Sequence, residues 1–165
     1  MKNGKKTSGQ LLIESLIGVS VVVVGLLGIV GLVSRSLSLN RVISDQFTAS
    51  YLSLEGIEIA RNLLDANIIN SNAWNQDFDN INPDVSYEVD YKSELLEVSR
   101  DRFLKINDGG FYGYGDGDDT PFKRTLKVVN KIDTGEVVVQ SIVKWESRGG
   151  EYEINNEHHF YNWRP

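Results

Sequence analysis

This 165-residue sequence predicts an α+β fold, in which one long N-terminal helix packs against an antiparallel β-sheet. Three observations predict it. A predominantly apolar run extends from Leu11 to Val33, with one charged residue in it. A helical spacing of apolar residues continues after this run, and the C-terminal part alternates apolar and polar positions between glycine-containing turns. We divide the chain into a basic segment (residues 1–9), an apolar segment (10–34), an amphipathic segment (35–69) and a β-rich segment (70–165).

Residues 10–34 are long enough to cross a membrane as a helix. At 1.5 Å per residue, the 23 residues from Leu11 to Val33 span roughly 34 Å, whereas a bilayer core is about 30 Å thick. A cleaved secretory signal has a shorter apolar region followed by small residues, a pattern that Ser34-Arg35-Ser36 does not match. The lysines before the run and the acidic sequence after it predict a cytoplasmic N-terminus and an exported body.

Composition excludes several classes of protein. The formal net charge is −6 although the first nine residues are basic, so the rest of the chain is acidic and direct nucleic-acid binding is not expected. There are no cysteines, which excludes disulfides, thiol catalysis and cysteine-bound metals. The two histidines are adjacent, and no nucleophile–base–acid set is visible. We therefore expect no enzymatic activity.

One residue does not fit a plain membrane anchor. Glu14 lies inside the apolar run, where a carboxylate costs up to about 3 kcal/mol at the membrane centre and less near the interface. Gly9 stands five residues before it, at the end of a lysine-rich leader. Basic leader, glycine, apolar run and an acidic fifth residue thus occur together in residues 1–35.

This N-terminal pattern resembles type IV prepilins and type II secretion pseudopilins. The resemblance implies that a prepilin peptidase cuts between Gly9 and Gln10, that the new amine of Gln10 is methylated, and that Glu14 is the assembly carboxylate. Gln10 stands where the family commonly has phenylalanine, and an exposed N-terminal glutamine has cyclisation as an alternative fate. Cyclisation would remove the positive charge that a neighbouring subunit's Glu14 pairs with.

The helical pattern continues through residues 35–69 while polarity rises. Two neighbouring apolar stripes have three- and four-residue spacing. One contains Ile43, Phe47, Tyr51, Leu54 and Ile57, and the other contains Leu52, Gly56, Ala60 and Leu63. No proline interrupts the chain before Pro83, and asparagines after Asp65 indicate the end of the helix. We expect this half to pack on a head.

Residues 70–165 are expected to form that head as an antiparallel sheet. Alternation predicts strands over 85–91, 122–131, 137–145 and 152–163, with a short piece near 103–106. Turns are predicted at 133–136 and 147–150. A late strand containing Trp145, a glycine turn and a strand ending at Trp163 resemble minor pilins, as does the Glu55-Gly56-Ile57-Glu58 sequence followed by Arg61-Asn62.

The loop 108–119 is the sharpest polar feature of the head. Asp116, Asp118 and Asp119 lie on a glycine-rich backbone and offer hard oxygen ligands to calcium. The alternative is a solvated turn that presents Phe111, Tyr112 and Tyr114 to the sheet or a neighbour, because glycine and aspartate form turns readily. The second interpretation is favoured, and no other cofactor is expected.

The resemblance implies a structural subunit of a type IV pilus or related filament, most similar to a minor pilin. Its implied partners are other pilin subunits through helix–helix packing, the prepilin peptidase and methylase, and an inner-membrane assembly platform. It would first be a single-pass membrane protein and then part of an extracellular pilus or an envelope-spanning pseudopilus. The alternatives are a type II secretion pseudopilin and, in another class, a membrane-anchored extracytoplasmic binding domain.

Overall fold

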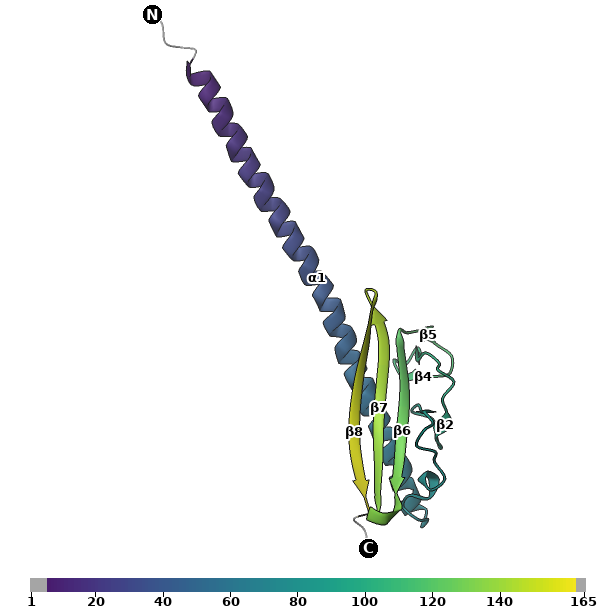
Figure 1. Cartoon of the computed structure of the whole chain (residues 1–165). Coiled ribbons are helices and arrows are strands. Elements are labelled where there is room, and N and C mark those ends of the chain that lie inside the picture. The colour runs from purple at the N-terminus through teal and green to yellow at the C-terminus, as the bar shows by residue number, and fades with distance from the viewer. Residues whose placement is uncertain (1–5, 163–165) are drawn as a thin grey trace, which may run out of the picture. The chain divides into compact units, whose positions relative to one another are not determined.

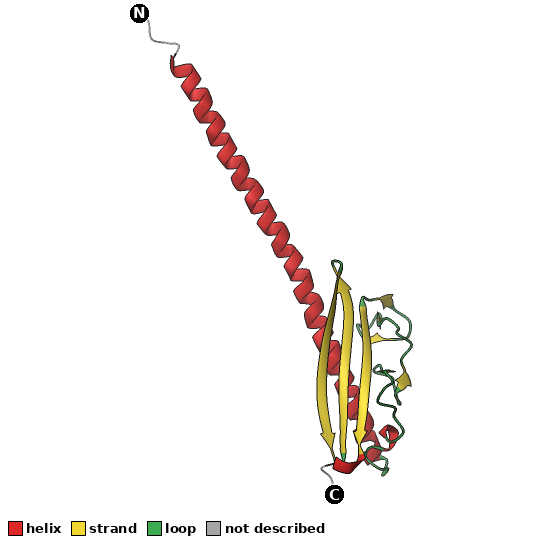
Figure 2. Cartoon of the chain, viewed as in Figure 1, coloured by secondary structure: helices red, strands yellow, loops and turns green. Residues whose placement is uncertain are grey.

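The computed structural model describes residues 6–162, and it has one long helix followed by antiparallel strands (Figures 1 and 2). Helix α1 comprises Lys6–Ile69. The chain divides into two compact units, Met1–Ser44 and Asp45–Pro165, so that α1 contributes to both. The remaining elements, all in the second unit, are η1 (Gln76–Phe78), β1 (Tyr87–Glu88), β2 (Glu97–Val98), β3 (Lys105–Ile106), β4 (Tyr112–Gly113), β5 (Asp118–Asp119), β6 (Phe122–Lys131), η2 (Ile132–Thr134), β7 (Glu136–Ser147) and β8 (Gly150–Tyr161).

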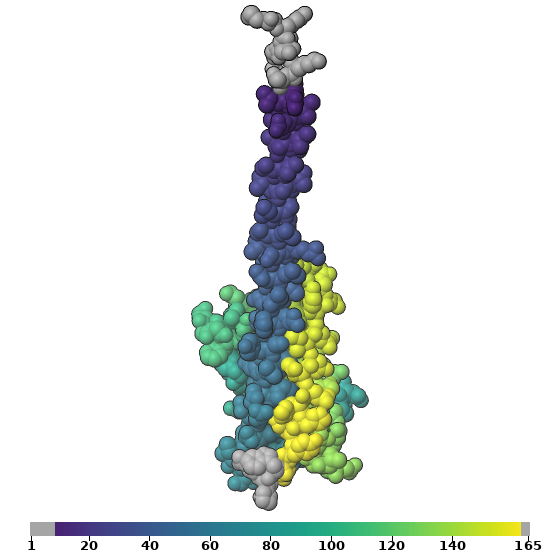
Figure 3. Space-filling model, turned by 90° about the vertical axis from the view of Figure 1, so that its left-hand side faces the viewer, coloured from purple at the N-terminus to yellow at the C-terminus, as the bar shows by residue number. Residues whose placement is uncertain are grey.

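The head contains two antiparallel sheets. The larger has the order β2-β1-β6-β7-β8 and the smaller has the order β4-β3-β5. The register of β7 and β8 runs without interruption from Glu136 opposite Tyr161 to Ser147 opposite Gly150. Strand β8 is thus an edge strand, and Figure 3 shows it open beside the head part of α1.

The turn residues explain the two long hairpins. Arg148 and Gly149 connect β7 to β8 with φ of 54° and 78°, the two positive angles that a tight two-residue hairpin turn requires. Gly135 follows η2 with φ of 63°, a left-handed conformation that glycine adopts without a steric penalty. Both predicted turns are therefore confirmed, as is the strand over residues 122–131.

The strand predicted over residues 85–91 is wrong in extent, because only Tyr87–Glu88 is strand. Tyr87, Glu88 and Val89 are all buried, which breaks the expected alternation. Beyond them, side chains replace the ladder as hydrogen-bond partners: Asp90 N–H donates to Ser93 Oγ, and the Val89 carbonyl accepts from Arg124. The last strand ends at Tyr161, and Trp163 lies outside the described residues.

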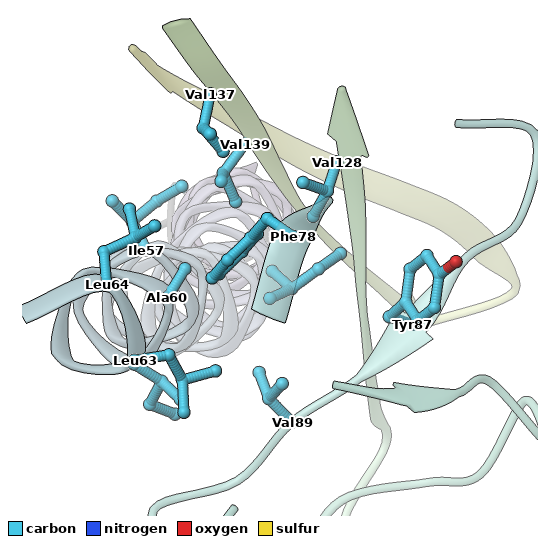
Figure 4. Close-up of a cluster of buried hydrophobic side chains, with 12 residues drawn as sticks. Ile57, Ala60, Leu63, Leu64, Phe78, Tyr87, Val89, Val128, Val137 and Val139 are labelled. Atoms are coloured by element: carbon cyan, nitrogen blue, oxygen red, sulfur yellow. The ribbon is translucent and has the colours of Figure 1, made fainter. Parts of the chain in front are cut away.

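The head's core lies between its part of α1 and the larger sheet. One cluster gathers Ile57, Ala60, Leu63 and Leu64 of α1 with sheet residues such as Val128 (Figure 4). A second cluster joins Ala49 and Leu52 to Leu104, Phe122, Val143 and Trp145. The predicted α+β architecture, with a helix packed on an antiparallel sheet, is therefore confirmed.

Only one of the two predicted helical stripes lies wholly in this core. Leu52, Ala60 and Leu63 of the second stripe are buried. Of the first stripe, Ile57 is buried, whereas Phe47, Tyr51 and Leu54 are 63%, 71% and 51% exposed. The head part of α1 thus buries one face and leaves an apolar strip on another.

Candidate assembly site

The first unit consists of α1 residues whose apolar side chains are uncovered. Between Leu11 and Val33 every large apolar side chain is 48% to 71% exposed. This stretch is long and apolar enough to cross a membrane. Its serines direct their hydroxyls back to the helix, since Ser15 donates to the Leu12 carbonyl at 2.9 Å and Ser20 to the Leu16 carbonyl at 2.7 Å. Such a surface fits a membrane anchor and needs lipid or other apolar helices around it.

Glu14 is the acidic residue of this surface. It lies exposed on α1 and forms no hydrogen bond or ion pair with any residue that the structure describes. An unpaired carboxylate inside an apolar layer is costly, so a cation from outside residues 6–162 would stabilise it. This isolation gives the predicted assembly residue a physical need for a partner.

Gly9 and Gln10, the predicted processing site, lie near the start of α1. The helix begins at Lys6, which places Gly9 in the first turn, where backbone N–H groups lack helical partners and helices fray. Residues 1–5 of the predicted leader lie outside the described residues. The bond between Gly9 and Gln10 therefore lies at an end of α1, where unwinding breaks few helical hydrogen bonds.

Glycines lie on the same helical face as Glu14. Positions 14, 18 and 25 are separated by four and seven residues, a spacing that brings Gly18 and Gly25 onto the face of Glu14. A Cβ atom on either glycine would meet nothing within 4 Å, so neither is needed for packing within this chain. Small residues in membrane helices allow another helix to approach closely. The Glu14 face is thus the face best suited to close helix–helix contact.

In the head, the largest fully buried side chain is a charged one that sequence analysis missed. Arg124 is fully buried, and it joins three segments of the head. Its Nη1 donates to the Leu52 carbonyl at 3.0 Å and to Glu55 Oε2 at 2.7 Å, while Nη2 donates to the Val89 carbonyl at 2.7 Å. Residues 122, 124 and 126 share one face of β6, and Phe122 and Leu126 are apolar. This two-residue spacing was the signal in the sequence that Arg124 points into the core.

Gly56 makes room for this arrangement. A Cβ atom at position 56 would lie 2.4 Å from Ser141 Oγ and 3.2 Å from Arg124 Cδ. Nearby, Ser53 donates to the Ser141 carbonyl at 2.7 Å. Glu55 pairs with the buried Arg124 and so fixes α1 to the sheet, whereas Glu58 and Arg61 form an exposed ion pair at 2.7 Å.

Glu88 provides a second buried anchor, for the segment after β2. Its Oε1 accepts from the backbone N–H groups of Arg100 and Arg102, and its Oε2 accepts from Arg102 Nε at 2.7 Å. Burial raises the pKa of Glu88, but these hydrogen bonds outweigh it and leave the pKa below its usual value. The carboxylate thus holds the 97–102 segment against β1.

The three candidate aspartates of the loop lie on β5 and just before it. Asp118 and Asp119 lie on β5, where Asp119 is 3.5 Å from Lys105 Nζ, and Asp116 is exposed before that strand. Within residues 6–162, no three carboxylate or imidazole side chains are gathered to hold a metal ion. Phe111 instead lies against Tyr91, with ring centroids 5.2 Å apart. The geometry of the described residues is that of a turn-rich loop.

The adjacent histidines point to opposite sides of β8, as expected for consecutive strand residues. His158 lies against Phe160 on the side of α1, whereas His159 contacts Glu136 and lies 3.0 Å from Glu157 Oε1. Hydrogen bonds from Lys131, His159 and Tyr161 lower the pKa of Glu136 to about 2, and contacts with Glu136 and Glu157 raise the pKa of His159. This cluster lies at the end of the sheet where β6 and β8 end and β7 begins.

Comparison with known proteins adds no assignment. Neither the protein-family models, nor the curated proteins, nor the solved structures give a significant match to this chain.

Proposed function

We propose that this chain is a type IV pilin-like structural subunit, most similar to a minor pilin, which is processed after Gly9 and assembled through its N-terminal helix. The observation that carries the proposal is Glu14. It is a carboxylate with no partner among residues 6–162, it lies in an exposed apolar helix, and it stands five residues after a glycine that ends a basic leader. A plain anchor has no physical use for such a group.

The proposed mechanism pairs charges between subunits. Cleavage after Gly9 creates an amine on Gln10, and methylation keeps that amine cationic. In a packed bundle of helices, the amine of one subunit pairs with Glu14 of a neighbour, and the two charges compensate each other in an apolar layer. Because a misplaced subunit leaves both charges unpaired, the pair specifies register more than it adds stability.

The rest of α1 supports the same arrangement. Gly18 and Gly25 leave the Glu14 face open to a second helix. Farther along, Phe47, Tyr51 and Leu54 form an exposed apolar strip on the head's own part of α1. Neighbouring subunits would cover both surfaces in a filament, and the prepilin peptidase, methylase and inner-membrane assembly platform would act before that.

Two other functions share part of this support. A type II secretion pseudopilin would have the same processing and helix packing, and would end in an envelope-spanning pseudopilus rather than an extracellular pilus. A single-pass anchor for an extracytoplasmic binding domain needs only the apolar helix. The anchor gives Glu14 no role, so substitution at this position separates it from both filament functions.

The test is filament assembly by Glu14→Gln in native cells. We expect normal membrane insertion and normal cleavage, with loss of the subunit from sheared surface or periplasmic filaments. Glu14→Asp should retain partial assembly, and Ser15→Ala, the neighbouring substitution, should assemble normally. Normal incorporation of Glu14→Gln would overturn the assembly role and leave the anchor.

A further inference from the structure

Strand β8 is a long sheet edge with one unpaired side. It comprises Gly150–Tyr161, and its other side pairs with β7. Within residues 6–162, the backbone of residues 151–161 forms no hydrogen bond with any segment except β7. The remaining edge strands, β2, β4 and β5, have two residues each. Strand β8 is therefore the one long edge that these residues offer to a partner, and Figure 3 shows it beside the head part of α1.

The hairpin with β7 determines which backbone groups are free. Its two-residue turn makes Ser147 and Gly150 a hydrogen-bonded pair, and such pairs alternate with non-hydrogen-bonded ones along an antiparallel ladder. The odd-numbered residues from 151 to 161 therefore direct their N–H and C=O groups away from β7. Ile154 and Phe160 pack on the two core clusters, so the even-numbered side chains face α1. The odd-numbered side chains lie on the outer face of the sheet.

The sequence of β8 lacks the features that usually prevent strand addition. Proteins protect sheet edges with lysine, proline, bulges or very short strands. Residues 151–161 contain no lysine, proline or glycine, and their register with β7 has no bulge. At about 3.4 Å per residue, these 11 residues present roughly 37 Å of straight edge. The edge is thus long and regular enough to pair with another extended chain.

A groove beside this edge can receive side chains from an added strand. It lies between α1 and the C-terminal half of β8, and its volume is about 430 Å³. A strand next to β8 would direct alternate side chains toward α1, as β8 does. Apolar side chains on that face would leave water by entering the groove. The groove is lined by the apolar residues Leu64, Ile68, Trp74 and Phe160, and by Arg61 and His158.

Unpaired carboxylates on the outer face set the charge that a partner needs. Glu146 of β7 and Glu151 of β8 lie directly opposite each other, and both are exposed. Neither forms an ion pair or hydrogen bond with residues 6–162, whereas the neighbouring Glu153 is 3.3 Å from Lys144. Like charges opposite each other on adjacent strands are destabilising. A basic side chain on the outer face of an added strand, next to Glu151, would compensate for this repulsion.

We propose that β8 binds an extended segment of another protein as an additional strand of the larger sheet. The main chain of the segment pairs with the free N–H and C=O groups of β8 and supplies affinity. Its side chains supply specificity, because those toward α1 are apolar and enter the groove, while a basic one on the outer face pairs with Glu151. The site uses head residues alone, so it does not depend on the proposed filament.

A second copy of this chain does not meet these requirements. Pairing of β8 with itself brings Glu151, Glu153 and Glu157 of both copies to one seam, and residues 150–161 contain no lysine or arginine to compensate for them. A symmetric antiparallel pair also reverses one head relative to the other. Identical chains anchored in one membrane carry their heads in the same direction. The segment therefore comes from a different protein.

Binding of a designed peptide to the full chain in a non-ionic detergent tests the proposal. The peptide has ten residues that alternate lysine and valine, so one face is basic and the other apolar. Its control alternates glutamate and valine. We expect saturable binding of the lysine peptide, followed by fluorescence anisotropy, and at least about fivefold weaker binding of the glutamate peptide. Glu151→Lys should reduce this difference to less than about twofold, because it removes the carboxylate that selects the basic side chain.

Two substitutions at Asn155 separate main-chain pairing from charge attraction. The N–H group of residue 155 points away from β7, so Asn155→Pro removes a free donor and leaves the ladder with β7 intact, whereas Asn155→Ala keeps the donor. We expect Asn155→Pro to weaken binding of the lysine peptide at least about tenfold and Asn155→Ala to change it less than about twofold. Tryptophan fluorescence checks that both heads are folded, and the Glu151→Lys comparison tests the site without a proline.

Equal binding by Asn155→Pro and Asn155→Ala, or no saturable binding of the lysine peptide, would overturn the proposal. Dimerisation of the chain that Asn155→Pro abolishes, without peptide binding, would also overturn it and identify a second copy as the occupant. Glu14→Gln should bind the peptide as the unchanged chain does. A failure of filament assembly is thereby distinguished from a failure of strand addition.

Discussion

The two parts of α1 have opposite surroundings within one unbroken helix. Between Leu11 and Val33 all large apolar side chains are exposed, whereas in the head Ala49, Leu52 and Ala60 are buried against the sheet. The first part is apolar on every side, and the second is apolar in stripes. A helix with one apolar stripe finds its partner within its own chain, while a helix that is apolar all round must find lipid or other chains.

The polar groups differ in the same way. In the head, the buried Arg124 pairs with Glu55 and two carbonyls of the same chain, whereas Glu14 in the first part has no described partner. Substitutions in the head should therefore change the stability of the isolated chain. Substitutions in the first part should change only what the chain does with others.

The largest stability effect should come from Arg124→Ala. It leaves the buried carbonyls of Leu52 and Val89 and the one-third-exposed carboxylate of Glu55 without their donor, and each buried polar group left unsatisfied costs about 1–3 kcal/mol. Denaturant unfolding in detergent, followed by tryptophan fluorescence, measures it. The control is Glu58→Ala, whose exposed partner is Arg61 and whose cost should stay below about 1 kcal/mol. Equal effects would contradict the anchoring role of Arg124.

Gly56→Ala should have the next largest effect. The new methyl group would lie 2.4 Å from Ser141 Oγ, and overpacking of this kind costs about 1–3 kcal/mol. The same change at Gly28, where a Cβ would meet nothing within 4 Å, should leave head stability unchanged. Unfolding midpoints of the two variants, measured side by side, check the contrast. A stabilised Gly56→Ala would show that α1 does not approach β7 this closely.

Stability should also depend on pH through Glu136 and His159. The folded pKa of Glu136 is lowered to about 2, so its contribution is complete above its ordinary pKa near 4.5 and is lost as pH falls toward 2. The folded pKa of His159 is raised, so its contribution is complete below about 6.5 and is lost as pH rises through the raised value. Unfolding midpoints across pH should therefore fall on both sides, and His159→Gln should remove the alkaline decline. An unchanged alkaline decline in that variant would exclude His159 as its cause.

The smallest stability effect is expected on the exposed strip of the head helix. Tyr51 is 71% exposed, so Tyr51→Ser should change the free energy of unfolding by less than about 0.5 kcal/mol. If other subunits cover this strip, the same variant should nevertheless reduce filament incorporation. Comparing the free energy of unfolding with the amount of subunit in sheared filaments separates the effect on stability from the effect on assembly. A large loss of stability would place Tyr51 in the head's own core.

Prediction from the sequence succeeded where structure depends on local pattern and failed where it depends on contacts between distant residues. The apolar run, the long helix, the strand over residues 122–131 and both hairpin turns were predictable, because each depends on local periodicity or turn chemistry. The 85–91 segment was not, since its backbone is satisfied by Ser93 and Arg124, which periodicity does not reveal. The role of Arg124 was not predicted either. Its position in the strand alternation points the side chain inward, but its partner Glu55 lies on a helix far away in the sequence.

The candidate site at the N-terminus was predictable because its residues are close together in the sequence. Gly9, Gln10 and Glu14 form a pattern within a few residues, and no tertiary contact is needed to recognise it. What the structure adds is the isolation of Glu14 and the openness of its helical face. Under the proposed function, the groups that complete this site belong to neighbouring subunits.

The most direct test of the central claim is the intact mass and N-terminal peptide of the protein extracted from its native membrane. The account predicts a chain that begins at Gln10 and carries one added methyl group. A chain that still begins at Met1, in cells where the prepilin peptidase is active, would contradict the filament assignment and leave a membrane-anchored protein.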